Sequence, residues 1–143
     1  VSGHAGLFST APDLVRFVQF LLRGGATEAA GTGAQGQRGT GGAQLVRAQT
    51  LAEFTRVQQP GFSSRALGWD TPSENSSAGS RMSARAFGHT GFTGTSLWVD
   101  PEQDLFVILL TNRVHPTREN NAIREARRQV ADLAVAAVVG ARR

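Results

Sequence analysis

The chain has 143 residues, 40% of them apolar, and a formal net charge of +4, which is enough apolar material for one domain with a core and excludes an intrinsically disordered protein. It contains no cysteine and no tyrosine, and all 15 of its basic residues are arginine. This composition excludes disulfides, thiol nucleophiles, a lysine general base and a P-loop. No stretch approaches the roughly 18 consecutive apolar residues of a membrane span, and the first residues lack the layout of a signal peptide.

The N-terminal segment begins at Val1 and runs through Gly3, His4 and Gly6 directly to a helix start. We therefore expect the chain to be cut from a longer protein. His4 lies beside two glycines, and we expect it to be structural rather than part of a site.

The first predicted helix has consistent start and stop signals. Ser9 or Thr10 can cap it, Pro12 suits its first turn, and Asp13 stands three residues after Thr10, as in a capping box. Apolar residues then recur at helical spacing, and Gly24-Gly25 ends the helix. The apolar positions are Leu14, Phe17, Val18, Leu21 and Leu22.

Residues 24–42 are rich in glycine and poor in apolar groups, which predicts a flexible surface insertion. Within it, residues 31–36 match the dinucleotide pattern G-x-G-x-x-G. That pattern binds a pyrophosphate only between a strand and a helix N-terminus, and no strand precedes it here. We therefore assign it no function.

The remaining elements form a mixed pattern. A short helix is expected over about Thr50 to Gln58, before Pro60-Gly61, and a short strand over Ala66 to Asp70, followed by a loop over 71–86. Three strands follow, at Phe87 to Gly91, Thr95 to Val99 and Leu105 to Thr111.

The compact connection from Asp100 to Asp104 favours antiparallel pairing of the last two strands, and the apolar run from Leu105 to Leu110 predicts a strand covered on both faces. A final helix is expected from about Arg118 to Val139 and can close one face of the sheet. Its predicted apolar side consists of Ile123, Ala126, Val130, Leu133, Ala134, Ala137 and Val138.

Few residues suggest chemistry by themselves. The three histidines, His4, His89 and His115, are far apart and lack metal-ligand spacing, and G-x-S-x-G does not occur, so neither a metal site nor an α/β-hydrolase elbow is expected. The arginines are scattered except at 118–128 and at the C-terminus, which favours a solvated surface over nucleic-acid binding.

The segment His89-Thr90-Gly91-Phe92-Thr93-Gly94 is the exception. It places a titratable ring and a hydroxyl beside glycines on a predicted strand, where glycine often marks the close approach of another molecule. From these residues alone, a structural turn and a functional site remain equal alternatives.

Three blocks of sequence occur in a familiar order: "GLFSTAPDLVRFVQFLL", "FGHTGFTGTSLWVDPEQDLFVILLTNR" and "HPTRENNAIREARRQVADLAVAAV". In this order they resemble the C-terminal part of the serine β-lactamase-related hydrolases, which include class C β-lactamases, D-alanyl-D-alanine carboxypeptidases, D-aminopeptidases and esterases. The resemblance covers most of the chain apart from 24–42. It implies an α/β (α+β) fold of the β-lactamase/transpeptidase type, with an antiparallel sheet covered by a C-terminal helix and a helical segment at the N-terminus.

The resemblance also implies a mechanism. In the family, the serine of a Ser-x-x-Lys motif attacks a carbonyl and forms an acyl-enzyme, with help from a Tyr-x-Asn tyrosine. A chain without lysine and tyrosine carries neither motif, so we expect residues 1–143 to be a portion of one domain whose nucleophile-bearing part is absent, and to be inactive alone. Relatives often act outside the cytoplasm on cell-wall material.

By the same resemblance, His89-Thr90-Gly91 lines the cleft, and the Phe92 N–H is one donor of the oxyanion hole. Thr90 can donate to a substrate acid group, and the backbone near Thr93 can pair with a peptide-like substrate. No cofactor is implied, and the implied partner is an ester, amide or β-lactam substrate.

One position departs from the β-lactamase pattern: His89 stands where most β-lactamases carry lysine. A mostly neutral imidazole anchors a carboxylate less strongly but can donate a hydrogen bond, which favours an esterase or peptidase. For His115, Thr117 and Arg118, a solvated loop is favoured over a binding segment. The alternatives are a non-catalytic binding module with a penicillin-binding-like cleft and, third, nucleic-acid binding based only on charge.

Overall fold

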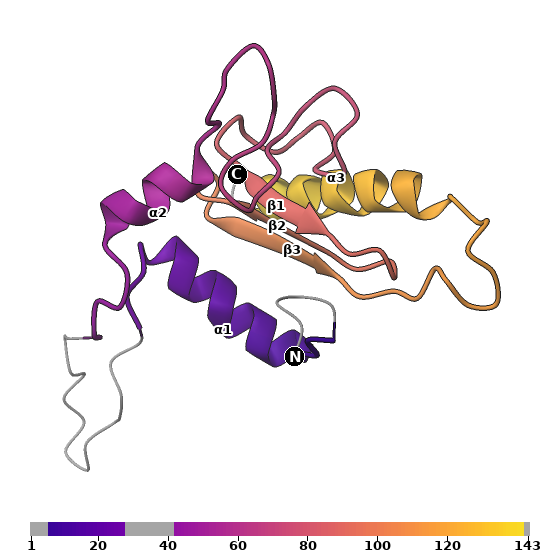
Figure 1. The fold of residues 1–143 in the computed structure, drawn as a ribbon, viewed down its shortest axis with the longest axis horizontal. Helices are drawn as coiled ribbons and strands as arrows, with labels where there is room; N and C mark the ends of the chain where they lie inside the picture. Colours follow the sequence, from indigo (N-terminus) through magenta and orange to yellow (C-terminus); the bar gives the residue numbers. More distant parts are fainter. Residues whose placement is uncertain (1–5, 28–41, 142–143) are drawn as a thin grey trace.

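The computed structural model describes residues 6–27 and 42–141, and its centre is an antiparallel sheet with helices packed against it (Figure 1). In this part of the chain the sheet has three strands in the order β1 (Phe87–Thr90), β2 (Ser96–Asp100) and β3 (Leu105–Leu109). The helices are α1 (Ala11–Leu22), α2 (Ala48–Thr55) and α3 (Ile123–Ala141), and α3 runs along the sheet (Figure 1). The predicted fold class and the antiparallel pairing are confirmed.

Helix α1 begins and ends as its sequence predicts. Thr10 is the N-cap: its Oγ1 accepts the Asp13 N–H at 3.3 Å and donates to Asp13 Oδ2 at 2.9 Å. At the other end, Gly24 and Gly25 adopt φ of +68° and +89°, which side-chain-bearing residues rarely adopt. Residues 28–41 of the predicted insertion, including the 31–36 glycine pattern, lie outside the described residues, as does His4.

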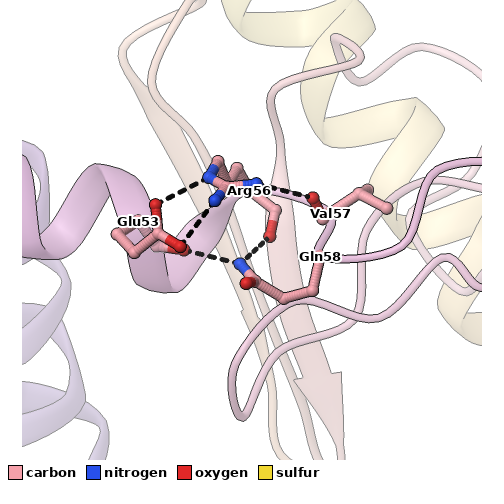
Figure 2. Close-up of polar contacts among 4 residues, drawn as sticks. All are labelled: Glu53, Arg56, Val57 and Gln58. Atoms are coloured by element: carbon pink, nitrogen blue, oxygen red, sulfur yellow. Dashed lines mark hydrogen bonds and ion pairs between the residues drawn. The ribbon is translucent and has the colours of Figure 1, made fainter.

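Helix α2 ends at Thr55 rather than at the predicted Gln58, because side chains satisfy its last carbonyls. Figure 2 shows the arrangement: Gln58 Nε2 donates to the carbonyls of Glu53 and Arg56, at 2.8 and 3.0 Å. The Arg56 guanidinium holds both carboxylate oxygens of Glu53, at 2.6 and 2.7 Å (Figure 2). With these groups paired, Arg56 takes an extended conformation and the helix stops.

The strand predicted over Ala66 to Asp70 is wrong, because the segment turns back on itself. Gly68 has a φ of +79°, and the Ala66 N–H donates to the Trp69 carbonyl at 3.0 Å. Asp70 alone pairs with β1, exchanging backbone hydrogen bonds of 2.7 and 2.9 Å with Gly88. This turn fixes residues 65–70 at the edge of β1.

Two apolar layers cover the sheet, as the apolar run in β3 predicts. Alternate strand residues point to opposite faces. On one face, Trp98 and Leu105 pack against α3 together with Ala78, Met82, Ala86, Ala131 and Val135. On the other face, Phe87 and Val99 pack against Val18 of α1, with Trp69 and Phe106 at the margin.

Helix α3 differs from its prediction in both its start and its buried face. It begins at Ile123 rather than near Arg118, and its buried residues are Arg127, Ala131 and Val135. Leu133 of the predicted apolar side is 70% exposed in the described part of the chain. Alanine at position 131 lets the helix approach the large Trp98 ring. The size of the side chain at this contact, rather than the number of apolar residues, therefore determines which side of α3 is buried.

A buried carboxylate organises the β2–β3 connection. Asp100 is fully buried, and its oxygens accept hydrogen bonds from Ser83, Glu102 and Gln103 at 2.6 to 3.2 Å. Burial on its own raises the pKa of Asp100, but the donors of Ser83 and Gln103 outweigh burial, and the pKa lies below its ordinary value.

We predict that Asp100→Asn lowers the free energy of unfolding at pH 7 by about 1–3 kcal/mol, because buried donors lose a charged acceptor. Since folding lowers this pKa, the stabilisation is complete above the ordinary carboxyl pKa of about 3.9 and is lost as pH falls through the folded value. The difference between wild type and variant should therefore shrink below about pH 4. Urea unfolding followed by circular dichroism measures it, with exposed Glu102→Gln as the control. A difference that does not change with pH would contradict the assignment.

Candidate active site

His89 lies on β1 with its ring exposed, and both ring nitrogens have partners. Nε2 is 3.2 Å from Arg65 Nη1, and Nδ1 is 2.9 Å from the Thr90 carbonyl oxygen. Arginine only donates and a carbonyl only accepts, so these partners assign the neutral ring with its proton on Nδ1. In this arrangement the His89 N–H is occupied by main chain rather than directed at a ligand.

Arg65 is a site residue that the sequence reasoning missed. Besides the His89 contact, its Nε forms an ion pair with Asp70 Oδ1 at 3.1 Å. Backbone contacts also fix its segment, because the Gln58 N–H donates to the Arg65 carbonyl at 3.2 Å. Arg65 thus places a cation beside His89. The sequence carried no signal for this contact, because the two residues are 24 positions apart.

Thr90 and His89 do not share one side of β1. Successive strand residues alternate, so His89 shares the face of Phe87 and Thr90 lies on the face toward α3. Thr90 lines a hollow of about 590 Å³ between α3 and the loop after Asp70. Arg124, Arg127 and Arg128 lie on the helical side of this hollow.

The turn between β1 and β2, residues 91–95, is held by its carbonyl groups. Each of the five consecutive carbonyl oxygens accepts at least one hydrogen bond. The donors are Arg127 Nη2 and Gly94 N to Gly91 O (2.7 and 3.2 Å), Arg113 Nε to Phe92 O (2.8 Å), Arg113 N to Thr93 O (2.8 Å), Thr111 Oγ1 to Gly94 O (2.8 Å), and Arg127 Nη2 and Gly91 N to Thr95 O (2.7 and 2.8 Å).

The Phe92 N–H, by contrast, has no acceptor among residues 6–27 and 42–141. A trans peptide unit holds its C=O and N–H in opposite directions, so the Gly91 carbonyl points to Arg127 while the Phe92 N–H points away from it. Phe92 is 65% exposed, and the Arg113 guanidinium carbon lies 4.7 Å from the centroid of its ring. A hollow of about 370 Å³ adjoins the turn, lined by Thr90, Gly91, Phe92 and Arg113 among others.

The other predicted positions take less part in this arrangement. Thr93 is exposed at the tip of the turn, and His115, Thr117 and Arg118 are exposed in the segment before α3. The Arg113 guanidinium bridges that segment and the turn, since its Nη1 donates to the Arg118 carbonyl at 3.2 Å and its Nε to the Phe92 carbonyl at 2.8 Å. Within the described residues, no three acidic or histidine side chains group as metal ligands, and no helix is long and apolar enough to cross a membrane.

Comparisons with known proteins agree on one class. The fold is similar to that of a crystal structure of a beta-lactamase from Mycobacterium bovis, with a TM-score of 0.66 and 26% identity over 91% of this chain and 44% of that one. The family model described as Beta-lactamase matches residues 1–132. The chain therefore belongs to the beta-lactamase family.

Curated relatives carry a different name within the family. Two proteins named "Putative D-alanyl-D-alanine carboxypeptidase", from Salmonella gallinarum and Salmonella paratyphi B, are each 36% identical over 118 residues. These alignments cover 80% of this chain and 24% of each relative. The chain thus spans about a quarter of the length of the curated relatives it matches.

We predict that Gly94→Ala lowers the free energy of unfolding by about 1–3 kcal/mol. Gly94 has a φ of +125°, and a Cβ there would lie 2.6 Å from Thr111 Oγ1 and 2.9 Å from the Thr111 carbonyl oxygen. Gly140→Ala in α3 is the matched control, because its Cβ meets nothing within 4 Å and alanine favours the helix, so its stability should be unchanged or higher. Thermal unfolding of both variants measures the difference, and equal melting temperatures would contradict the strained turn.

Proposed function

We propose that the protein carrying this chain is a serine hydrolase that forms an acyl-enzyme on ester, amide or β-lactam substrates. The observation that carries the proposal is the Phe92 N–H, which has no acceptor in the described chain while the carbonyls around it are all hydrogen-bonded. A donor held in this way can stabilise the charge that develops on a carbonyl oxygen without reorganising.

The proposed roles follow the geometry of the strand end. Phe92 supplies one oxyanion-hole N–H, and the end of β1 at His89, Thr90 and Gly91 forms the wall of the cleft, with the His89 and Thr90 side chains on its two opposite faces. The exposed backbone near Thr93 is available to a peptide-like substrate. The nucleophile and its base come from outside residues 1–143, because Ser-x-x-Lys and Tyr-x-Asn need residue types that this chain lacks.

Arg65 contributes a positive charge next to this wall. His89 is neutral in its assigned tautomer, so the positive charge beside it belongs to the Arg65 guanidinium, 3.2 Å from the ring. A guanidinium binds a carboxylate through paired hydrogen bonds. We therefore propose that Arg65, with His89, receives a carboxylate or other acidic group of the substrate, and that neutral esters bind without it.

The full-length protein should be labelled covalently by a fluorophosphonate and should hydrolyse p-nitrophenyl acetate with a burst of p-nitrophenol, because an acyl-enzyme accumulates. Residues 1–143 expressed alone should show neither labelling nor turnover. Intact-protein mass spectrometry and stopped-flow absorbance measure the two effects. If the full-length protein is not labelled by a fluorophosphonate or a β-lactam, the hydrolase proposal fails and a non-catalytic binding module is favoured.

Arg65→Met in the full-length protein should raise the KM for a substrate with a free carboxylate about tenfold, which corresponds to about 1.4 kcal/mol. The KM for p-nitrophenyl acetate should stay within about twofold, because a neutral ester has no group for the guanidinium. Arg56→Met is the matched control, since that arginine pairs with Glu53 at the end of α2. Equal changes for both substrates would contradict the assigned role of Arg65.

A further inference from the structure

We propose that Arg127 is a positioning residue that fixes the direction of the Phe92 N–H, an inference that rests on the proposed function of that N–H. Arg127 belongs to α3, and only 8% of its surface is exposed. Its Nη2 donates to the carbonyls of Gly91 and Thr95, each at 2.7 Å. A single side-chain nitrogen from α3 therefore binds the carbonyl groups at both ends of the turn that carries Phe92.

The direction of the N–H follows from the geometry of one peptide unit. In the Gly91–Phe92 unit, the carbonyl is drawn toward Arg127, and planarity sends the N–H the opposite way, away from α3. Rotation of this unit would require the carbonyl to leave a charged donor, and hydrogen bonds to charged groups are the stronger ones. The guanidinium thus opposes the motion that would misdirect the N–H.

The guanidinium also acts on the strength of the donor. A positive charge on the carbonyl side of a peptide group polarises it, and a polarised peptide donates a stronger hydrogen bond from its N–H. Arg113 contributes in the same sense at the next peptide, because its Nε donates to the Phe92 carbonyl at 2.8 Å. The two arginines bind successive carbonyls of the turn.

Packing alone does not account for an arginine at this position. The next buried residues of the same helix face are Ala131 and Val135, which are small and apolar. Arg127 Nε is buried and has no hydrogen-bond partner in the described chain, and burial together with the charge of Arg113 lowers the pKa of Arg127. A buried cation with an unpaired N–H disfavours folding, so its benefit lies in the contacts it makes with the turn.

The test compares Arg127→Met and Arg127→Lys in the full-length protein, with Arg16→Met as the control. Arg16 is an exposed arginine of α1 that pairs with Asp13 at 3.0 Å and lines neither hollow. For p-nitrophenyl acetate, Arg127→Met should lower kcat at least about tenfold while KM stays within about threefold, because a misdirected donor acts mainly on the transition state. Arg127→Lys, which keeps a cationic donor, should recover part of this loss, and Arg16→Met should match wild type.

Rates are expressed per folded active site. The end point of fluorophosphonate labelling gives the number of active sites, and the melting temperature of each variant shows whether it is folded at the assay temperature. If Arg127→Met does not fold, the split between kcat and KM in Arg127→Lys carries the test. If the wild type is active and the Arg127 variants have the same kcat per folded site, or differ only by a higher KM, the role of Arg127 is overturned. The hydrolase proposal then remains intact. A wild type that is neither labelled nor active would instead overturn the proposed function, and this inference with it.

Discussion

The turn between β1 and β2 depends on hydrogen bonds that its own residues supply only in part. Its N–H groups reach the carbonyls of Gly91 and Thr95, so the carbonyls between them need donors from elsewhere. Arg113 and Thr111 provide these from the segment after β3, and Arg127 of α3 adds a charged donor to Gly91 and Thr95. The terminal helix therefore does more than cover the sheet, because its polar contact determines the geometry of the turn where the proposed chemistry takes place.

The same solution recurs at three other places in the described chain. Side chains satisfy main-chain groups at the start of α1, at the end of α2 and at the β2–β3 connection, through Thr10, Gln58 and Asp100 respectively. The apolar layers on the two faces of the sheet hold α3 and α1 against it. Polar contacts thus fix the local geometry of the connections, while apolar packing places the helices.

The sequence predicted the positions of the helices and strands better than it predicted which side of each one is buried. Periodicity located α1, the three strands and α3 to within a few residues, and the family resemblance is confirmed by the comparisons. The prediction of the buried side of α3 was wrong, because counting apolar residues ignores how much space is available beside Trp98. The proposed wall at His89 and Thr90 stays a prediction, and the structure adds that their side chains lie on opposite faces of β1.

Local signals in the sequence determined where α1 starts and stops and how the last two strands pair, because caps, glycines and alternation act over a few neighbouring residues. They also determined that Ser-x-x-Lys and Tyr-x-Asn cannot lie in this chain. Only the tertiary structure placed Arg65 against His89 and Arg127 against Gly91, across 24 and 36 residues of sequence. Contacts at such separations leave no periodic trace, since they depend on how the chain folds back on itself and not on the spacing of its residues.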